Sequence, residues 1–378
     1  MSPHLVPPAL RGIRGKARRW TYLHAARLEN GLRRPGSAGG LAVRNLLVIH
    51  MQAAGDMLLA VPALAELARR GMRLHLLTSP TAAVFLRELP FFASITTDEP
   101  TAMRASYDAA VDFQDTFTTW RRALVLSRVK APHRVGLTRG GFSPWGASTR
   151  VTKDMGPIHD HCWKLLAAAA GLPLTPAPFT WPSLPHGLGE LGKLSKTLPE
   201  GLIIGIHVAN KNPLKRMAPA TTAGLVAALD ERFKGRCSYV FTGLAPEAEQ
   251  VARAMDAVAR HLRPHCHDWS GRLGAAGLIE HIRALDMLFT VDTSVFHLAA
   301  MTETPCVGAF GPTLLNYWGP WSPYQKAASL QLACRPTENL RRTLALDDRC
   351  CPYDEPRCMT GLSAAHLMET AEPFLTDL

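Results

Sequence analysis

Residues 286–313, DMLFTVDTSVFHLAAMTETPCVGAFGPT, contain the pattern that most constrains the fold of this chain. Residues 287–291 form a continuous apolar run, which is too short for a typical helix and suits a strand buried on both faces. Residues 295–301 have the composition of a short helix, and Pro305 prevents its continuation. A second apolar strand is expected at residues 306–310. The segment therefore predicts a βαβ unit of a parallel sheet.

Three polar residues stand between the first of these strands and the helix. Asp292 closes the strand, and Thr293 and Ser294 are residue types that cap helix N-termini. Free N–H groups at a helix N-terminus attract anions, and open α/β sheets bind ligands at the carboxyl ends of their strands. The pattern predicts a ligand site here. The alternative is that Asp292 or Ser294 only caps the helix.

The segment from Asp292-Thr-Ser-Val-Phe-His297 to Gly311-Pro-Thr313 resembles the carboxy-terminal signature of the heptosyltransferase family, glycosyltransferase family 9. Its members are nucleotide-sugar glycosyltransferases of lipopolysaccharide core synthesis. The family usually has glycine where this chain has Ser294. We therefore expect the approach of the backbone to a diphosphate to differ in this chain.

A second motif follows the first expected strand, residues 46–49. A turn of small residues ends in Gly55-Asp56, and the sequence Leu-Leu-Ala-Val-Pro-Ala-Leu begins at Leu58. This arrangement resembles the amino-terminal signature of the same family. His50 stands where members commonly have a basic residue, which changes the contacts expected with an acceptor.

The helix that follows this turn is expected at residues 57–70, because its apolar residues recur at helical spacing. Pro62 lies within its early part and is expected to kink it or to move its start. Gly55 is the only glycine in the preceding turn, so the glycine fingerprint of dinucleotide-binding enzymes is missing. The sequence accordingly disfavours a nicotinamide enzyme.

The resemblance covers about residues 43–375 and implies an α/β fold of GT-B architecture, with two Rossmann-like domains facing across a cleft. A length of 378 residues also suggests two domains, and a proline-rich stretch marks the linker between them. The expected divisions are a basic arm (1–40), an acceptor domain (41–175), a linker (176–199), a nucleotide-sugar domain (200–360) and a carboxy-terminal helix that packs on the first domain (361–378).

The formal net charge of +11 is concentrated near the amino-terminus. Residues 1–40 contain eight basic residues and one acidic residue, together with Trp20, Tyr22 and Leu23. Such an arm suits an anionic membrane surface, where each basic residue contributes about 1 kcal/mol. A basic tail without a specific partner is the alternative. Nucleic acid would also attract this charge, but the chain lacks aromatic residues interleaved on a sheet, so no nucleic-acid partner is expected.

No apolar run reaches the roughly 18 residues that a membrane-spanning helix needs, and the amino-terminus lacks the apolar core of a signal peptide. We therefore expect a cytoplasmic protein that is peripheral at the inner membrane. The eight cysteines are too scattered for a disulfide scaffold. The Cys350-Cys351 doublet lacks the paired spacing of a zinc site, so neither a metal nor a cofactor is expected.

By resemblance, Asp56 is the catalytic base and Lys215 holds the leaving diphosphate. Transfer of a sugar from a nucleoside diphosphate requires a base near the acceptor hydroxyl and positive charge near the departing group. An aspartate with an ordinary pKa of about 3.9 is ionised at neutral pH and can accept the proton. The alternatives are that Asp56 caps the following helix and that Lys215 is a solvated loop residue.

The other donor-site candidates follow expected strands of the second domain. Asp292 would bind hydroxyl groups of the donor sugar, and the dipole of the helix after Ser294 would add to the diphosphate site. Glu247 follows the turn at Thr242-Gly243 and by resemblance approaches the nucleotide. His297 lies in an apolar helix and is expected to be structural, although the resemblance retains it as a site residue. The remaining candidates are Asn210, Lys211, Thr293 and Thr313.

The sequence therefore predicts an inverting, metal-independent glycosyltransferase that uses a nucleotide-sugar donor and an anionic glycolipid acceptor. By resemblance the donor is ADP-heptose and the acceptor is lipopolysaccharide core. Two alternatives stay open. One is transfer of another sugar to another glycan, and the other is a catalytically silent, membrane-associated binding protein of the same fold.

Overall fold

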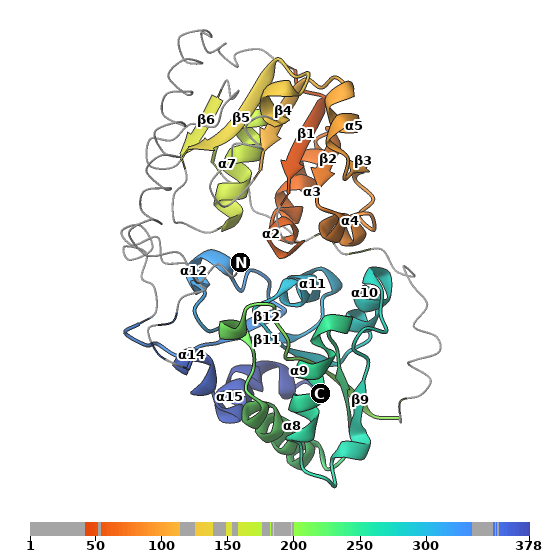
Figure 1. The fold of residues 1–378 in the computed structure, drawn as a ribbon, viewed down its shortest axis with the longest axis vertical. Helices are drawn as coiled ribbons and strands as arrows, with labels where there is room; N and C mark the ends of the chain where they lie inside the picture. Colours follow the sequence, from red (N-terminus) through yellow and green to blue (C-terminus); the bar gives the residue numbers. More distant parts are fainter. Residues whose placement is uncertain are drawn as a thin grey trace, which may run out of the picture. The chain divides into compact units, whose positions relative to one another are not determined.

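The computed structural model describes residues 42–51, 54–113, 125–138, 149–152, 158–175, 200–334 and 355–378, together with residues 182, 184, 198, 351 and 353. The basic arm and most of the expected linker lie outside the described residues. The chain divides into two units, the first mainly from residues up to Phe179 and the second mainly from Thr180–Leu378 (Figure 1). Each unit is an α/β structure with its own parallel sheet.

In the described part of the first unit, six strands form a parallel sheet in the order β3-β2-β1-β4-β5-β6. β1 lies inside the sheet and all but the first of its residues are buried, which explains its apolar sequence. The elements are β1 (Asn45–His50), α2 (Ala54–Leu58), α3 (Val61–Arg69), β2 (Arg73–Thr78), α4 (Pro80–Leu86), β3 (Phe92–Thr96), α5 (Glu99–Arg104), β4 (Ala109–Asp112), β5 (His133–Thr138), β6 (Thr149–Thr152) and α7 (Ile158–Ala170).

The single helix expected at residues 57–70 is two helices in the structure. α2 ends at Leu58, and α3 begins at Val61 with Pro62 in its first turn. Proline is tolerated there because the first N–H groups of a helix have no partner within the helix. Pro62 therefore moves the start of the helix, and Asp56 lies in the short helix that precedes it.

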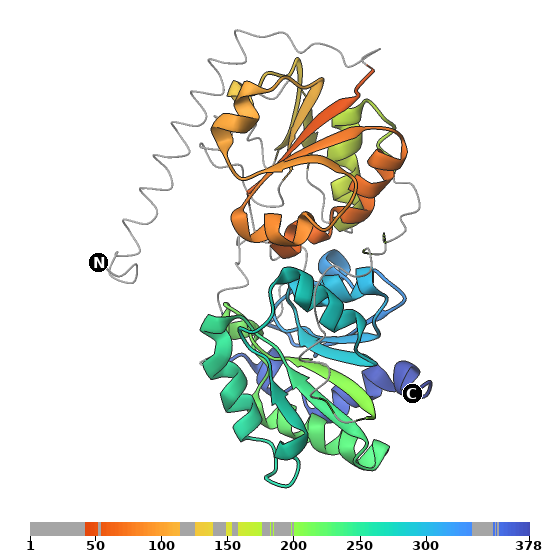
Figure 2. The ribbon, with the colours of Figure 1, turned by 90° about the vertical axis from the view of Figure 1, so that its right-hand side faces the viewer.

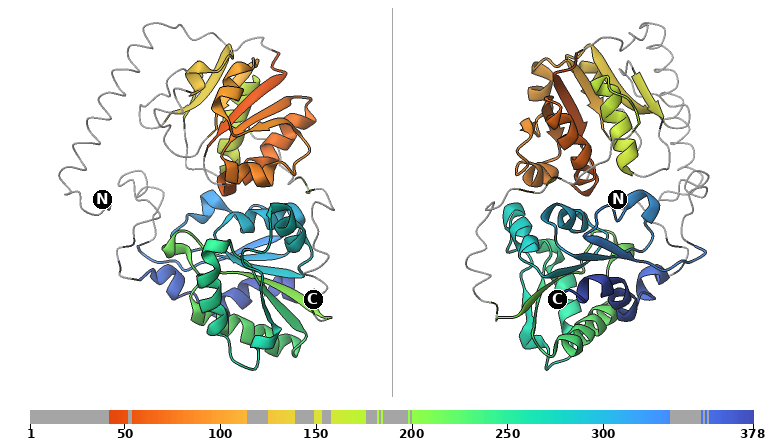
Figure 3. Two further views of the ribbon diagram at one scale, coloured as in Figure 1. Left: turned by 45° about the vertical axis from the view of Figure 1, so that its right-hand side comes forward. Right: turned by 180° about the vertical axis from the view of Figure 1, so that it is seen from behind.

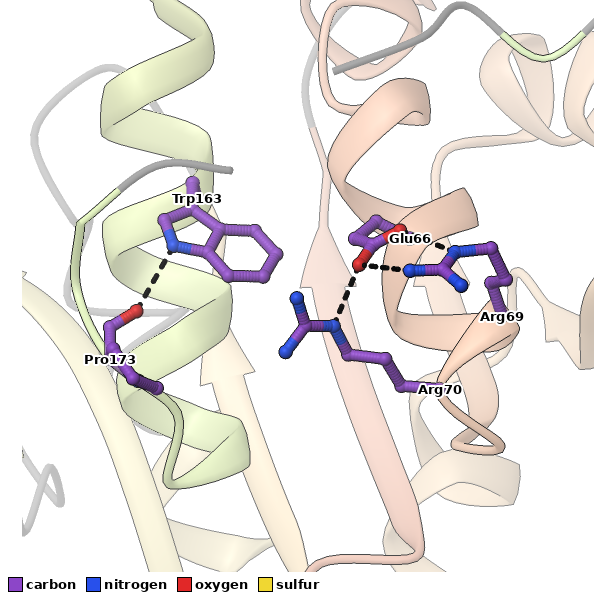
Figure 4. A network of polar contacts seen from close by, with 5 residues as sticks. All are labelled: Glu66, Arg69, Arg70, Trp163 and Pro173. Carbon is purple, nitrogen blue, oxygen red and sulfur yellow. Dashed lines mark hydrogen bonds and ion pairs between the residues drawn. The ribbon is translucent and has the colours of Figure 1, made fainter. Parts of the chain in front are cut away.

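A polar network joins the last turn of α3 to α7 (Figure 4). Glu66 accepts hydrogen bonds from Arg69 at 2.8 Å and from Arg70 at 2.7 Å, and these contacts lower the pKa of Glu66 to about 2. The guanidinium carbon of Arg70 lies 5.4 Å from the ring centroid of Trp163. The indole N–H of Trp163 donates to the carbonyl oxygen of Pro173 at 3.1 Å. The network fixes α3 against α7.

In the described part of the second unit, six parallel strands are ordered β12-β11-β10-β7-β8-β9. The elements are β7 (Leu202–His207), α8 (Pro219–Phe233), β8 (Cys237–Phe241), α9 (Ala248–Asp256), β9 (Cys266–Asp268), α10 (Ala275–Arg283), β10 (Met287–Val291), α11 (Ser294–Thr302), β11 (Cys306–Ala309), α12 (Leu315–Trp318), β12 (Gln325–Ala328), α14 (Arg357–Thr360) and α15 (Ala364–Leu375). The βαβ unit expected from residues 286–313 is confirmed.

Helices pack on both faces of the second sheet (Figure 2). Val307 and Ala309 of β11 belong to a core cluster that also contains residues of α8, α9 and α15. Gly308 lies between them and faces the other side, because successive residues of a strand point to opposite faces. A Cβ at Gly308 would lie 2.8 Å from the ring of Phe296. α11, which carries Phe296, therefore packs on the face opposite to α8.

The carboxy-terminal helix does not pack as we expected. It contacts α8, β11 and β12 of the second unit, so its assignment to the first domain is corrected (Figure 3). Leu367 and Leu375 are buried in the core of the second unit. Arg232 of α8 forms an ion pair with Glu372 at 2.9 Å. α15 thus completes the hydrophobic core beneath the second sheet.

Candidate functional site

The carboxyl edge of the second sheet brings two loops together where the strand order reverses. β7 and β10 are adjacent, and the chain continues from β7 to β8 on one side and from β10 to β11 on the other. Open α/β sheets bind ligands at such a switch point. Asn210, in the loop after β7, donates its side-chain N–H to the backbone oxygen of Asp292, after β10, at 2.9 Å. This hydrogen bond fixes one loop against the other.

Lys215 and Asp292 form an ion pair at this edge. The Lys215 Nζ lies 2.9 Å from the Asp292 Oδ2, and the two side chains are 16% and 10% exposed. Thr313, after β11, donates its hydroxyl to the same Oδ2. Within the described residues, no hydrogen bond reaches the Oδ1 of Asp292. Two donors therefore orient the carboxylate and leave one oxygen for a ligand.

A short 3₁₀ turn, Pro213–Lys215, presents Lys215 to this carboxylate. Asn212 caps the turn by accepting the N–H of Leu214 at 3.0 Å, and Asn210 accepts the N–H of Asn212 at 2.8 Å. Asparagine side chains commonly bond their own backbone two residues on. Because these bonds fix the turn and Lys215 is paired and largely buried, the alternative of a solvated loop lysine is wrong.

Thr293 caps α11. Its backbone is extended, and its hydroxyl accepts the N–H of Val295 at 3.3 Å. The alternative that Asp292 or Ser294 only caps this helix is therefore wrong. Ser294 is the first residue of α11 and is half-buried. α11 begins two residues after Asp292. The positive end of its helix dipole at this point favours an anionic ligand.

His297 lies in the next turn of α11 and is buried. Burial lowers the pKa of its imidazole to about 4, the Asp292 carboxylate opposes this shift, and the Lys215 ammonium adds to it. The side chain is therefore neutral at neutral pH, and its Nδ1 has no hydrogen-bond partner among the residues that the structure describes. Its structural role stays a prediction.

Glu247 and Lys211 differ from the other donor-site candidates. Glu247 is buried, and its carboxylate accepts the N–H of Leu244 at 2.8 Å, so it shapes its own turn after β8. Lys211 is exposed and makes no ion pair within the described ranges. The structure brings together Asn210, Lys215, Asp292 and Thr313, and it gives Glu247 and Lys211 no hydrogen bond to that group.

Asp56 belongs to the first unit. It is half-buried in the middle of α2, so it is not the N-cap of that helix. His50, at the carboxyl end of β1, is buried, and its ring centroid lies 5.9 Å from that of Phe113. β1 therefore ends in a side chain that is buried inside the first unit, and α2, which carries Asp56, follows it in the chain.

Sequence reasoning missed three residues that hold the site loops in place. Arg216 donates from Nε to the carbonyl oxygen of Asn210 at 2.9 Å, and Gln250 accepts the N–H of Asn210 at 3.3 Å. A Cβ added at Gly311 would lie 2.7 Å from the side chain of Met359. Arg216 could have been noticed because it follows Lys215. Gln250 and Met359 act across distant parts of the sequence and gave no local signal.

Replacement of Gly311 by alanine is expected to reduce transfer by about tenfold, because small displacements of site groups have effects of this order or larger. The new Cβ would meet Met359 and would lie 3.2 Å from the carbonyl oxygen of Leu214, which precedes Lys215. The measurement is the steady-state rate and the affinity for nucleotide. Gly274→Ala is the matched control, because nothing lies within 4 Å of a Cβ there. Recovery of the transfer rate in the double variant Gly311→Ala/Met359→Ala would support the clash with Met359 as the cause. Unchanged kinetics in Gly311→Ala would contradict it.

Three buried histidines of the second unit are expected to make its stability depend on pH. Burial lowers the pKa of His207, His281 and His297 to about 4 each. An unfolded histidine has a pKa near 6.5, so the unfolded state binds the proton first and stability is lost as the pH falls from about 6.5 to 4. At pH 5 each of the three histidines lowers the free energy of unfolding by about 2 kcal/mol relative to neutral pH.

Urea unfolding between pH 7.5 and pH 5 tests this expectation. His281→Phe is the informative variant, because His281 Nε2 has no partner among the described residues and its ring packs 4.8 Å from that of Trp269. The variant should lose less stability on acidification than the wild type. An unfolding midpoint that is constant over this pH range would contradict the neutral, buried state of these residues.

Neither a metal cluster nor a membrane span is found in the described part of the chain. No group of three or more His, Cys, Asp or Glu residues there could hold a metal ion. Among the same residues, no helix is long and apolar enough to cross a membrane.

Two α/β units, each with a parallel sheet, and a switch-point site on the second define the GT-B class of fold. The family model of glycosyltransferase family 9 (heptosyltransferase) matches residues 101–345, and the chain belongs to this family. The match includes Lys215, Asp292 and Thr313 and begins after Asp56.

Several proteins that are similar to this chain are described as heptosyltransferases. Lipooligosaccharide heptosyltransferase 2 of Campylobacter jejuni is 30% identical over 101 residues, which are 26% of this chain and 29% of that protein. The structure of E. coli ADP-heptose lipopolysaccharide heptosyltransferase II has a TM-score of 0.71 at 18% identity, over 88% of this chain and 99% of that one. E. coli heptosyltransferase WaaC with ADP has a TM-score of 0.64 at 14% identity, over 87% and 99%. These structures share the fold.

Proposed function

We propose that this protein is an inverting, metal-independent glycosyltransferase that transfers heptose from ADP-heptose to lipopolysaccharide core or a related lipid-linked glycan. Family membership supports the reaction class. Two structures with a similar fold, an ADP-heptose lipopolysaccharide heptosyltransferase and a heptosyltransferase with ADP, support this donor. The proposal depends most on the Lys215–Asp292 pair at the switch point of the second sheet.

The pair supplies both functions that a sugar diphosphate requires. Lys215 offers a point charge to the diphosphate, and the N-terminus of α11 adds a partial positive charge. Asp292 is oriented by Lys215 and Thr313, and its Oδ1 is left to accept a hydrogen bond from a sugar hydroxyl. On donor binding, Lys215 would be shared between the carboxylate and the phosphate.

In the proposed reaction, the Asp56 carboxylate accepts the proton of the acceptor hydroxyl. The hydroxyl oxygen attacks the anomeric carbon from the face opposite to the nucleotide, and the bond from that carbon to the diphosphate oxygen breaks. The configuration at the carbon inverts, and the electron pair leaves with the diphosphate. Lys215 stabilises the charge that develops there, which is the role for which other enzymes use a metal ion.

We also propose that the protein works in the cytoplasm, peripheral at the inner membrane, because its acceptor is lipid-linked. The basic residues of the segment 1–40 support an electrostatic association with anionic lipids. Binding to vesicles with and without anionic lipid, by the full chain and by a chain lacking residues 1–40, tests this part separately. Equal binding by both chains would contradict it.

Calorimetric titration with ADP, UDP and GDP tests the donor assignment. We expect selective binding of ADP in the presence of EDTA, and a strong loss of affinity in Lys215→Ala. Lys326→Ala is the matched control, because Lys326 of β12 is an exposed lysine of the same unit outside the proposed site. Selective binding of UDP or GDP would favour another sugar donor. Binding of none of the three would favour the silent binding protein.

A further inference from the structure

Arg216 is a second cation at the switch point, and the proposed mechanism does not yet use it. It follows the 3₁₀ turn that presents Lys215, and its side chain is half-buried. Its Nε donates to the carbonyl oxygen of Asn210 at 2.9 Å. Asn210 in turn donates its side-chain N–H to the backbone of Asp292 at 2.9 Å. The guanidinium is therefore tied to the same loop junction as the Lys215–Asp292 pair.

Among the residues that the structure describes, no carboxylate pairs with Arg216 as Asp292 pairs with Lys215. Lys215 lies 2.9 Å from the Asp292 carboxylate. Arg216 forms no ion pair with any residue that the structure describes, and the acceptor of its side chain among them is the neutral carbonyl oxygen of Asn210. Holding a half-buried cation without a carboxylate is unfavourable unless an anionic ligand or water compensates it. Within the described part of the chain, the loop after β7 thus keeps a net positive charge after Asp292 has neutralised Lys215.

The geometry of a guanidinium fits the missing ligand. The group has five N–H donors in a planar fork, and one of them is used by Asn210. Fixing Nε limits rotation of the plane, so less conformational entropy is lost when the Nη groups bind. Pairs of parallel N–H donors bind two phosphate oxygens at once, which a lysine ammonium cannot reproduce.

We propose that Arg216 is a second diphosphate-binding residue, which donates from its Nη groups to non-bridging oxygens of the leaving nucleoside diphosphate. This inference rests on the proposed function. Lys215 and Arg216 then have different tasks. Lys215 is shared between Asp292 and the diphosphate, whereas Arg216 supplies the charge that Asp292 does not neutralise.

Calorimetric titration of the full chain with ADP, AMP and adenosine tests the proposal. A charge-assisted hydrogen bond contributes about 1.5–3 kcal/mol, so Arg216→Ala should weaken ADP binding by about 10–100-fold. AMP should lose less affinity, and the binding of adenosine should be unchanged. Arg216→Lys keeps the charge without the fork and should recover only part of the ADP affinity. Arg260→Ala is the control, because Arg260 is an exposed arginine of the same unit, and it should bind all three ligands as the wild type does.

Two results would overturn the inference. In one, Arg216→Ala binds ADP as tightly as the wild type. In the other, Arg216→Ala weakens the binding of ADP and of adenosine equally and lowers the melting temperature. This would mean that Arg216 only holds the loop in place through its hydrogen bond to Asn210. Loss of ADP affinity in Lys215→Ala beside unchanged affinity in Arg216→Ala would refute this inference and keep the proposed function. A wild-type protein that binds no nucleoside diphosphate would refute both.

Discussion

Asp56→Asn is expected to lower the rate of sugar transfer by about 10²–10⁴-fold and to leave the affinity for ADP unchanged. The amide keeps the shape of the side chain but cannot accept the proton of the acceptor hydroxyl, and general-base catalysis contributes a factor of this size. Asp56 lies in α2 of the first unit, whereas the proposed donor site lies on the second. The measurement combines single-turnover transfer with calorimetric ADP binding on the same preparations.

The fold of the variant needs its own control, because Asp56 lies in a helix of five residues. Thermal unfolding of Asp56→Asn should match that of the wild type. Glu88→Gln removes a half-buried carboxylate from the segment between α4 and β3, outside the proposed site, and should transfer sugar at the wild-type rate. Transfer by Asp56→Asn at the wild-type rate would show that another group accepts the proton.

Lys215→Ala is expected to weaken ADP binding by about 100-fold or more. The variant loses a cation and leaves the Asp292 carboxylate, 10% exposed, without its ionic partner. A negative charge then faces the negative diphosphate, so the loss exceeds that of one hydrogen bond. The measurement is the ADP dissociation constant at two salt concentrations.

The double variant Lys215→Ala/Asp292→Asn separates the two effects. Removing the carboxylate should recover part of the ADP affinity, because repulsion is relieved while the cation is still absent. Asp292→Asn alone should bind ADP nearly as the wild type does and should transfer sugar poorly, since it loses the acceptor for a sugar hydroxyl. Additive effects of the two substitutions on ADP binding would mean that the ion pair is not part of the nucleotide site.

Local patterns predicted the βαβ unit at residues 286–313 of the second unit. The apolar run at Met287–Val291 is β10, and the helix expected at 295–301 is α11, which is one residue longer at each end, because strands buried on both faces and helix-capping residues leave clear sequence signals. The prediction of a single helix at 57–70 was wrong. Pro62 is compatible with the first turn of a helix, but the sequence did not show at which residue that helix begins. The packing of α15 depends on contacts with α8 across the chain, which no local pattern contains.

The residues of the candidate site could be identified from the sequence, but only some of their interactions could be predicted. Lys215 and Asp292 were identified from motifs, and the structure adds that they pair with each other. Glu247 was expected near the nucleotide, but its carboxylate accepts the N–H of Leu244. The fixed position of Arg216 depends on the turn at Pro213–Lys215, whose side-chain hydrogen bonds cannot be read from composition.

Acceptor-dependent release of ADP from ADP-heptose tests the central claim most directly. The assay would supply a heptose-deficient lipopolysaccharide core, quantify ADP and measure the mass of the acceptor. We expect ADP and an acceptor one heptose heavier to form in equal amounts with the wild type, and neither to form at a comparable rate with Asp56→Asn. Tight binding of ADP-heptose without any acceptor-dependent release of ADP would contradict the assignment as a heptosyltransferase of this acceptor.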